Sequence, residues 1–122
     1  MYSDVVVEHF TNPRNIGVVE NADGRGQDSN PVCGDFTRIT VRLADGKVAE
    51  AKFKTFGCSA AIASASMVTT LAVGKSIDQA SRISAQDVLA ALGGLPLVKE
   101  GCALMAAGAL RSAIADAKVR AG

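Results

Sequence analysis

The sequence has no tryptophan, a single histidine and a single tyrosine among its 122 residues. It also lacks an uncharged apolar run near the roughly 20 residues that a membrane-spanning helix needs. Its first ten residues, MYSDVVVEHF, lack the basic start and long apolar stretch of a secretory signal. The sequence therefore predicts a soluble cytoplasmic protein with no membrane partner.

An excess of charge of one sign is also missing. Thirteen Lys and Arg residues stand against twelve Asp and Glu residues, and no long run of like charge occurs. Because a nucleic-acid-binding chain usually carries a basic field, we expect no nucleic acid partner. The sequence has no Ser-His-Asp set, phosphate loop or pair of catalytic carboxylates, so we expect a carrier rather than an enzyme.

With 48% hydrophobic residues, the chain is expected to form a single domain over residues 1–122 whose core needs neither metal nor disulfide. Three cysteines are an odd number, and a reducing compartment keeps them as thiols. Metal or sulfur chemistry is therefore favoured over a disulfide framework.

Strands are predicted early in the chain. TRITVRL alternates, with Thr37, Ile39, Val41 and Leu43 facing inward and Arg38, Thr40 and Arg42 outward. The turn Asp45-Gly46 predicts a hairpin with KVAEAKFKT, in which Ala49, Ala51 and Phe53 face inward. The polar segment 16–31 predicts at most an edge strand.

Helices are predicted at residues 4–10, from 59 to a stop at Gly74, near Ser76, after Ser84 and from Cys102 onward. Since strands come first and helices last, the sequence predicts an α+β fold rather than a βαβ repeat.

All three cysteines lie at the ends of predicted elements and beside a glycine: Cys33 before the first good strand, Cys58 and Cys102 at helix starts. Helix N-termini favour thiolate, and Lys99 adds positive charge near Cys102. A buried, inert role is the alternative for any one cysteine. Asp35, two residues after Cys33, is the nearest candidate for a fourth ligand, or else a turn residue.

These residues resemble the U-type iron–sulfur cluster assembly scaffolds, the family of IscU and the NifU N-terminal domain. The resemblance rests on these stretches: HFTNPRNIG, CGD at 33–35, FKTFGCSAAIASAS at 53–66, GKS at 74–76, LPLVK at 95–99 and AIADAK in the last helix. It implies a small antiparallel sheet of about three strands with several helices on one face.

The resemblance also implies a function. The protein would receive persulfide sulfur from a cysteine desulfurase, combine it with iron and electrons into a labile 2Fe-2S cluster, and transfer that cluster to acceptor proteins. Cys33, Cys58 and Cys102 correspond to cluster ligands, Asp35 to the acidic residue that keeps the cluster labile, and Lys99 to a lysine beside the site. We expect Cys102 to be the first sulfur acceptor, because of its helix start and cationic neighbour.

Two positions depart from the family pattern. Gly101 stands where the family usually has a histidine, which favours Asp35 as the fourth ligand over an exogenous thiol or a partner's residue. His9 is expected to serve packing rather than to bind metal. The segment from Leu95 to Lys99 has one proline, whereas such scaffolds usually have two in the segment that a DnaK-type chaperone binds. Docking of the chaperone is therefore expected to be weaker. The alternative is that this segment is an apolar loop that covers the core.

Two other functions use the same residues. Cys33, Cys58, Cys102 and Asp35 would also form a tetrahedral zinc site in a sulfurtransferase accessory resembling SufU. A regulatory member without cluster chemistry is the third hypothesis. The basic side chains of Arg38, Arg42, Lys52 and Lys54 are expected to be solvated, or else to dock acidic partners.

Overall fold

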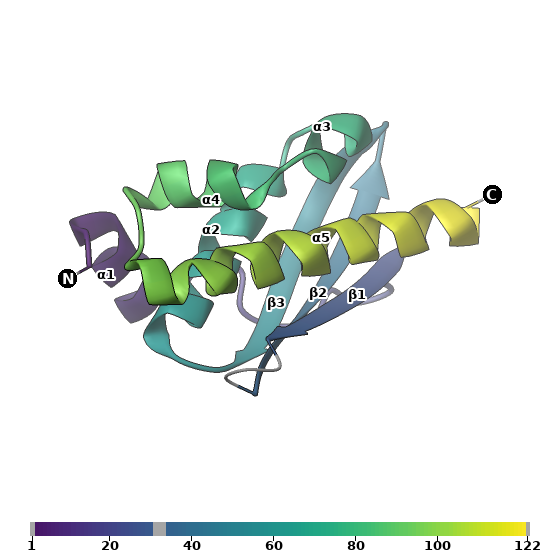
Figure 1. Cartoon of the computed structure of the whole chain (residues 1–122). Helices are drawn as coiled ribbons and strands as arrows, with labels where there is room; N and C mark the ends of the chain where they lie inside the picture. The colour runs from purple at the N-terminus through teal and green to yellow at the C-terminus, as the bar shows by residue number, and fades with distance from the viewer. Residues whose placement is uncertain (1, 31–33, 122) are drawn as a thin grey trace.

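The structure is a computed structural model that describes residues 2–30 and 34–121. A three-stranded antiparallel sheet, ordered β1-β2-β3, carries its helices on one face, which confirms the predicted α+β fold (Figure 1). The strands are β1 (Gly24–Asn30), β2 (Asp35–Ala44) and β3 (Lys47–Phe56). The helices are α1 (Asp4–Thr11), α2 (Ser59–Ala72), α3 (Ile77–Ser81), α4 (Ala85–Leu92), the 3-10 turn η1 (Leu97–Lys99) and α5 (Glu100–Ala121).

The predicted hairpin is present as β2 and β3, joined by Asp45 and Gly46, both with positive φ. A β-bulge between Arg42 and Leu43 shifts the register near the turn. Val48 is consequently fully buried, whereas Ala49 is only half-buried. The prediction that Ala49 faces the core was wrong, because strict alternation does not survive a bulge.

Strand β1 is polar in sequence, yet it pairs with β2 on one side and packs one of its faces against the long helix α5. A Cβ at Gly26 would clash with the backbone N of Ala113, and one at Gly24 would lie 2.7 Å from the Cβ of Ala117. Glycines on the strand and alanines on the helix therefore let the two backbones approach closely. The prediction of an edge strand in this segment is confirmed for Gly24–Asn30.

The opposite face of the sheet is partly covered. The backbone N–H of Val19 donates a hydrogen bond of 2.8 Å to the Thr40 hydroxyl, and both residues are buried. The prediction that Thr40 faces solvent was therefore wrong, because the segment that leads into β1 crosses this face. On the same face, Arg38 donates a hydrogen bond of 3.1 Å to the Gln27 side chain, and Arg42 donates one of 3.0 Å to the Glu50 carboxylate.

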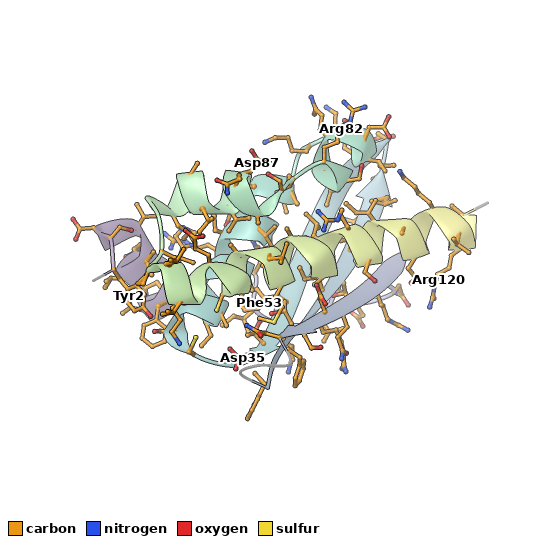
Figure 2. All side chains as sticks on the ribbon, in the orientation of Figure 1. Tyr2, Asp35, Phe53, Arg82, Asp87 and Arg120 are labelled. Atoms are coloured by element: carbon orange, nitrogen blue, oxygen red, sulfur yellow. The ribbon has the colours of Figure 1, made fainter. Side chains whose placement is uncertain are left out.

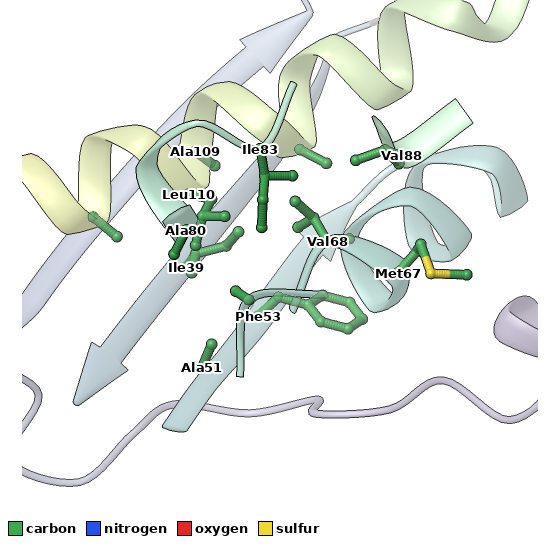
Figure 3. Packing of buried hydrophobic residues seen from close by; sticks show 14 of the residues in the cluster. Ile39, Ala51, Phe53, Met67, Val68, Ala80, Ile83, Val88, Ala109 and Leu110 are labelled. Atoms are coloured by element: carbon green, nitrogen blue, oxygen red, sulfur yellow. The ribbon is translucent and has the colours of Figure 1, made fainter. Parts of the chain in front are cut away.

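Helices α1 to α4 begin where the sequence predicts, whereas α5 begins at Glu100, two residues before the predicted start at Cys102. Ser3, Ser76 and Ser84 accept backbone hydrogen bonds as N-caps, the last two in capping boxes. Figure 3 shows the core between sheet and helices, where Phe53, Val68 and Leu110 meet. None of the helices in the described part of the chain is long and apolar enough to cross a membrane.

Candidate metal centre

Three side chains from distant parts of the chain converge at one end of the sheet. Asp35 is the first residue of β2, Cys58 is the N-cap of α2, and Cys102 is the third residue of α5. Asp35 lies near the connection from β3 to α2 (Figure 2). Extended backbone ends at Phe56 and helix begins at Ser59, so the short turn between them brings Cys58 next to the start of β2.

The donor atoms are close enough to bind one metal centre. The Sγ atoms of Cys58 and Cys102 lie 3.9 Å apart, and a carboxylate oxygen of Asp35 lies within 4.8 Å of both. Two thiolates on a tetrahedral zinc, with bonds of about 2.3 Å, lie about 3.8 Å apart. The spacing therefore fits two sulfur ligands and one oxygen ligand on a shared centre.

The two thiols differ in their surroundings. Cys102 is 2% exposed and packs against Ala60, Ala61 and Met105, whereas Cys58 is half-buried. Burial, followed by the proximity of Cys58 and Asp35, raises the pKa of Cys102 to about 12. The expectation that its helix start favours the Cys102 thiolate was wrong, because burial is the largest influence on the pKa of this thiol and raises it.

Lys99 lies close to both sulfurs, as expected. Its Nζ atom lies 3.8 Å from the Sγ of Cys58 and lowers the pKa of Cys102 only as the smallest of the influences on that thiol. The lysine therefore lies beside the site as predicted, within reach of the Cys58 sulfur, 41 positions away in sequence, and near enough to Cys102 to act on its pKa.

The other predicted residues lie elsewhere or are not described. Cys33 lies outside the described residues. His9 is buried, and its Nδ1 atom is 2.8 Å from the Ser66 hydroxyl on α2, which fits packing rather than metal binding. Burial and the nearby Arg14 lower the pKa of His9. Leu95 packs against the core, but Leu97 and Val98 are more than 80% exposed, so this segment covers the core only in part.

Two features of the site were missed in the sequence. Gly57 lies against Asp35, where a Cβ would be 2.7 Å from the carboxyl carbon. Phe36 and Phe56 stack with ring centroids 6.1 Å apart at the same end of the sheet, and Phe56 is 69% exposed. The pairing of these rings depends on the register shift at the bulge between Arg42 and Leu43, which the hairpin turn alone does not predict, and no local signal links Gly57 to Asp35.

Comparison with known proteins places the chain in a family. A family model described as the NifU-like N terminal domain matches residues 1–122. The iron-sulfur cluster assembly scaffold protein IscU 1 of Archaeoglobus fulgidus is 53% identical over 95% of this chain and 76% of its own length. The scaffold protein IscU of Escherichia coli is 43% identical over 96% of this chain and 94% of its own length.

Solved structures share the fold. A putative iron-sulfur cluster assembly scaffold protein for the SUF system from Fervidobacterium islandicum superposes with a TM-score of 0.76 at 20% identity, covering 93% of this chain and 96% of that one. At this identity the likeness concerns the fold alone. The family model and the two IscU relatives carry the assignment: the chain belongs to the NifU-like N-terminal domain family, as its sequence motifs predict.

Proposed function

We propose that this protein is a scaffold on which iron–sulfur clusters are assembled and from which they are passed on. The convergence of Asp35, Cys58 and Cys102, with donor atoms within 4.8 Å of one another, is the observation that carries the proposal. The IscU relatives are named for cluster assembly, most as scaffold proteins and the Drosophila melanogaster relative as an assembly enzyme. A carrier role fits a site with thiols and a carboxylate.

The cluster is the cargo of this site, and we propose a 2Fe-2S cluster held by Cys33, Asp35, Cys58 and Cys102. Thiolates are the preferred ligands of iron–sulfur clusters. A carboxylate oxygen among them is a harder donor and binds less firmly. Asp35 is therefore the ligand that we expect to be released first when the cluster leaves.

Sulfur is proposed to arrive as a persulfide from a cysteine desulfurase. A thiolate of the scaffold attacks the terminal sulfur, a persulfide forms on the scaffold, and the donor leaves as its thiolate. Cys102 remains the proposed acceptor, but its burial adds a condition. We propose that docking of the donor exposes this sulfur, for example by moving the half-buried Tyr2 and Leu95, which pack against the cluster of residues around Cys102.

Cys58 is the more accessible thiol before docking, and Lys99 lies beside it. Since its sulfur is 3.9 Å from that of Cys102, a persulfide formed on either thiol would be within reach of the other. Apo iron–sulfur proteins are the proposed acceptors of the finished cluster. The exposed Leu97 and Val98 support docking of a DnaK-type chaperone at Leu95 to Lys99, because such chaperones bind apolar segments.

Anaerobic reconstitution tests the proposal. The protein is incubated with ferrous iron, cysteine, a cysteine desulfurase and a thiol reductant that reduces persulfide sulfur to sulfide, and iron, sulfide and zinc are counted alongside absorption and Mössbauer spectra. We expect a 2Fe-2S signal that moves to an apo ferredoxin when the two are mixed. Folded protein without bound iron and sulfide would contradict the scaffold role.

A second candidate function uses the same three donors. The 3.9 Å spacing of the sulfurs fits tetrahedral zinc, so a zinc-bound sulfurtransferase accessory is the competing proposal. Tight, stoichiometric zinc that iron cannot replace, together with faster desulfurase turnover and no sulfide on the protein, would favour it. A regulatory role without cluster chemistry would be supported if serine at each cysteine left function intact.

A further inference from the structure

Two glycines occupy matching places in the site but differ in the space around them. Gly57 precedes Cys58, and Gly101 precedes Cys102. A Cβ at position 57 would lie 2.7 Å from Cγ and 2.9 Å from Oδ2 of Asp35. A Cβ at position 101 would meet the side-chain nitrogen of Asn30 at 3.2 Å. Only the first contact is too short for a real side chain to tolerate.

The backbone gives no separate reason for glycine at position 57. Its φ is not in the positive region that favours glycine, so an alanine could adopt the same conformation. The cost of a side chain there is therefore steric and falls on Asp35. The Cβ of Ala61, at 3.0 Å, closes the same space from the first turns of α2.

We propose that Gly57 is the positioning residue for Asp35: the space left by its missing side chain seats the carboxylate where it faces the two cysteine sulfurs. This inference rests on the proposed function, since it concerns how the oxygen ligand of the cargo is placed. Asp35 is only 8% exposed, and its carboxylate lies against the backbone at Gly57 rather than in solvent. Without this space the carboxylate would have to turn away from the sulfurs.

The space beside Gly57 also matches the length of the Asp35 side chain. The carboxyl carbon of Asp35 is the atom nearest to the absent Cβ. A glutamate would place an additional methylene there and move its carboxylate onward by one bond. An aspartate therefore places its carboxylate beside Gly57, and a glutamate would carry its carboxylate beyond this position.

Cobalt(II) titration tests this on apo protein, because the visible bands of cobalt report its oxygen and sulfur ligands without any cluster. We expect Gly57→Ala to lower cobalt affinity about tenfold, the scale of losing a residue that orients a metal ligand. Asp35→Ala should give the same loss and the same change of bands, and the double variant should lose no more. Gly101→Ala is the matched control and should bind as the native chain does.

Native cobalt affinity and bands in Gly57→Ala or in Asp35→Ala would overturn the inference, as would additive losses in the double variant. If Gly57→Ala alone does not fold, the double variant with Asp35→Ala decides instead: it should fold, because the two shortest contacts of the new Cβ are then removed, and a double variant that also fails to fold would overturn the inference. Reconstitution of the native chain is run in parallel. A failure to assemble a cluster there, with the expected cobalt results, would reject the scaffold function but leave the role of Gly57 intact.

Discussion

The Sγ atoms of Cys58 and Cys102 lie 3.9 Å apart, although 44 positions separate the residues in sequence. One sulfur is half-buried at the start of α2 and contacts Lys99, and the other is buried under the first turns of α5. The proposed site therefore contains one thiol that reagents can reach, Cys58, and one that they cannot, Cys102.

Alkylation should distinguish the two thiols in the reduced, metal-free protein. We expect iodoacetamide at pH 8 to modify Cys58 at least about tenfold faster than Cys102, since each unit of pKa changes the thiolate fraction about tenfold and burial raises the pKa of Cys102 to about 12. Peptide mass spectrometry at successive times measures both rates. Equal rates would show that Cys102 is exposed in solution.

Gly101→His should lengthen the life of the cluster. A Cβ at position 101 meets the flexible side chain of Asn30 at 3.2 Å, so a larger residue fits with a small adjustment. An imidazole there would replace the weaker oxygen ligand of Asp35 beside Cys102, and we expect the half-life to rise about tenfold. Loss of the visible absorption under a chelator measures it, with Gly101→Ala as control. A cluster that decays as fast as in the native chain would contradict this prediction.

Gly26→Ala should destabilise the fold without touching the site. Its Cβ would clash with the backbone of Ala113 and lie 2.6 Å from the carbonyl carbon of Ser112, so β1 would be forced away from α5. We expect the free energy of unfolding to fall by about 1–3 kcal/mol, as overpacked cores do. Urea unfolding measures it against Gly101→Ala, and an unchanged midpoint would show that β1 and α5 are less tightly packed.

Stability should fall as the pH drops from 7 to 5, in part because of His9. Burial and Arg14 lower the pKa of its folded form below the ordinary 6.5, while Glu8 opposes them. Below pH 6.5 the unfolded chain therefore binds the proton more readily than the folded one, and protonation favours unfolding. Thermal unfolding across this range should show a weaker pH dependence in His9→Gln, which keeps a polar side chain near Ser66. An identical dependence in both proteins would remove His9 as a cause.

The parts of the fold that local pattern specifies were predictable. Alternation and Asp45-Gly46 predicted the hairpin, and serine caps predicted the helix starts. Strand β1 has no apolar alternation, because its glycines pack against the backbone of α5 rather than burying side chains of their own. The bulge that buries Val48 depends on the pairing of two strands, which neither strand reveals alone.

The site was predictable as a set of residues but not in its electrostatics. Family motifs indicated Asp35, Cys58 and Cys102, and the fold brings them together. Proximity in sequence indicated that Lys99 lies near Cys102, but it did not indicate that the amine also contacts Cys58. The burial of Cys102 and the close approach of Asp35 to Gly57 both arise from contacts between distant segments, which a sequence pattern does not contain.

Cluster loading of cysteine variants tests the central claim most directly. Iron and sulfide are counted after anaerobic reconstitution of the native chain, Cys58→Ser and Cys102→Ser, each shown by circular dichroism to be folded. The proposed site predicts a 2Fe-2S cluster on the native chain and little or no stable cluster on either variant. Full loading of both variants would contradict it, because the cluster would then be bound elsewhere.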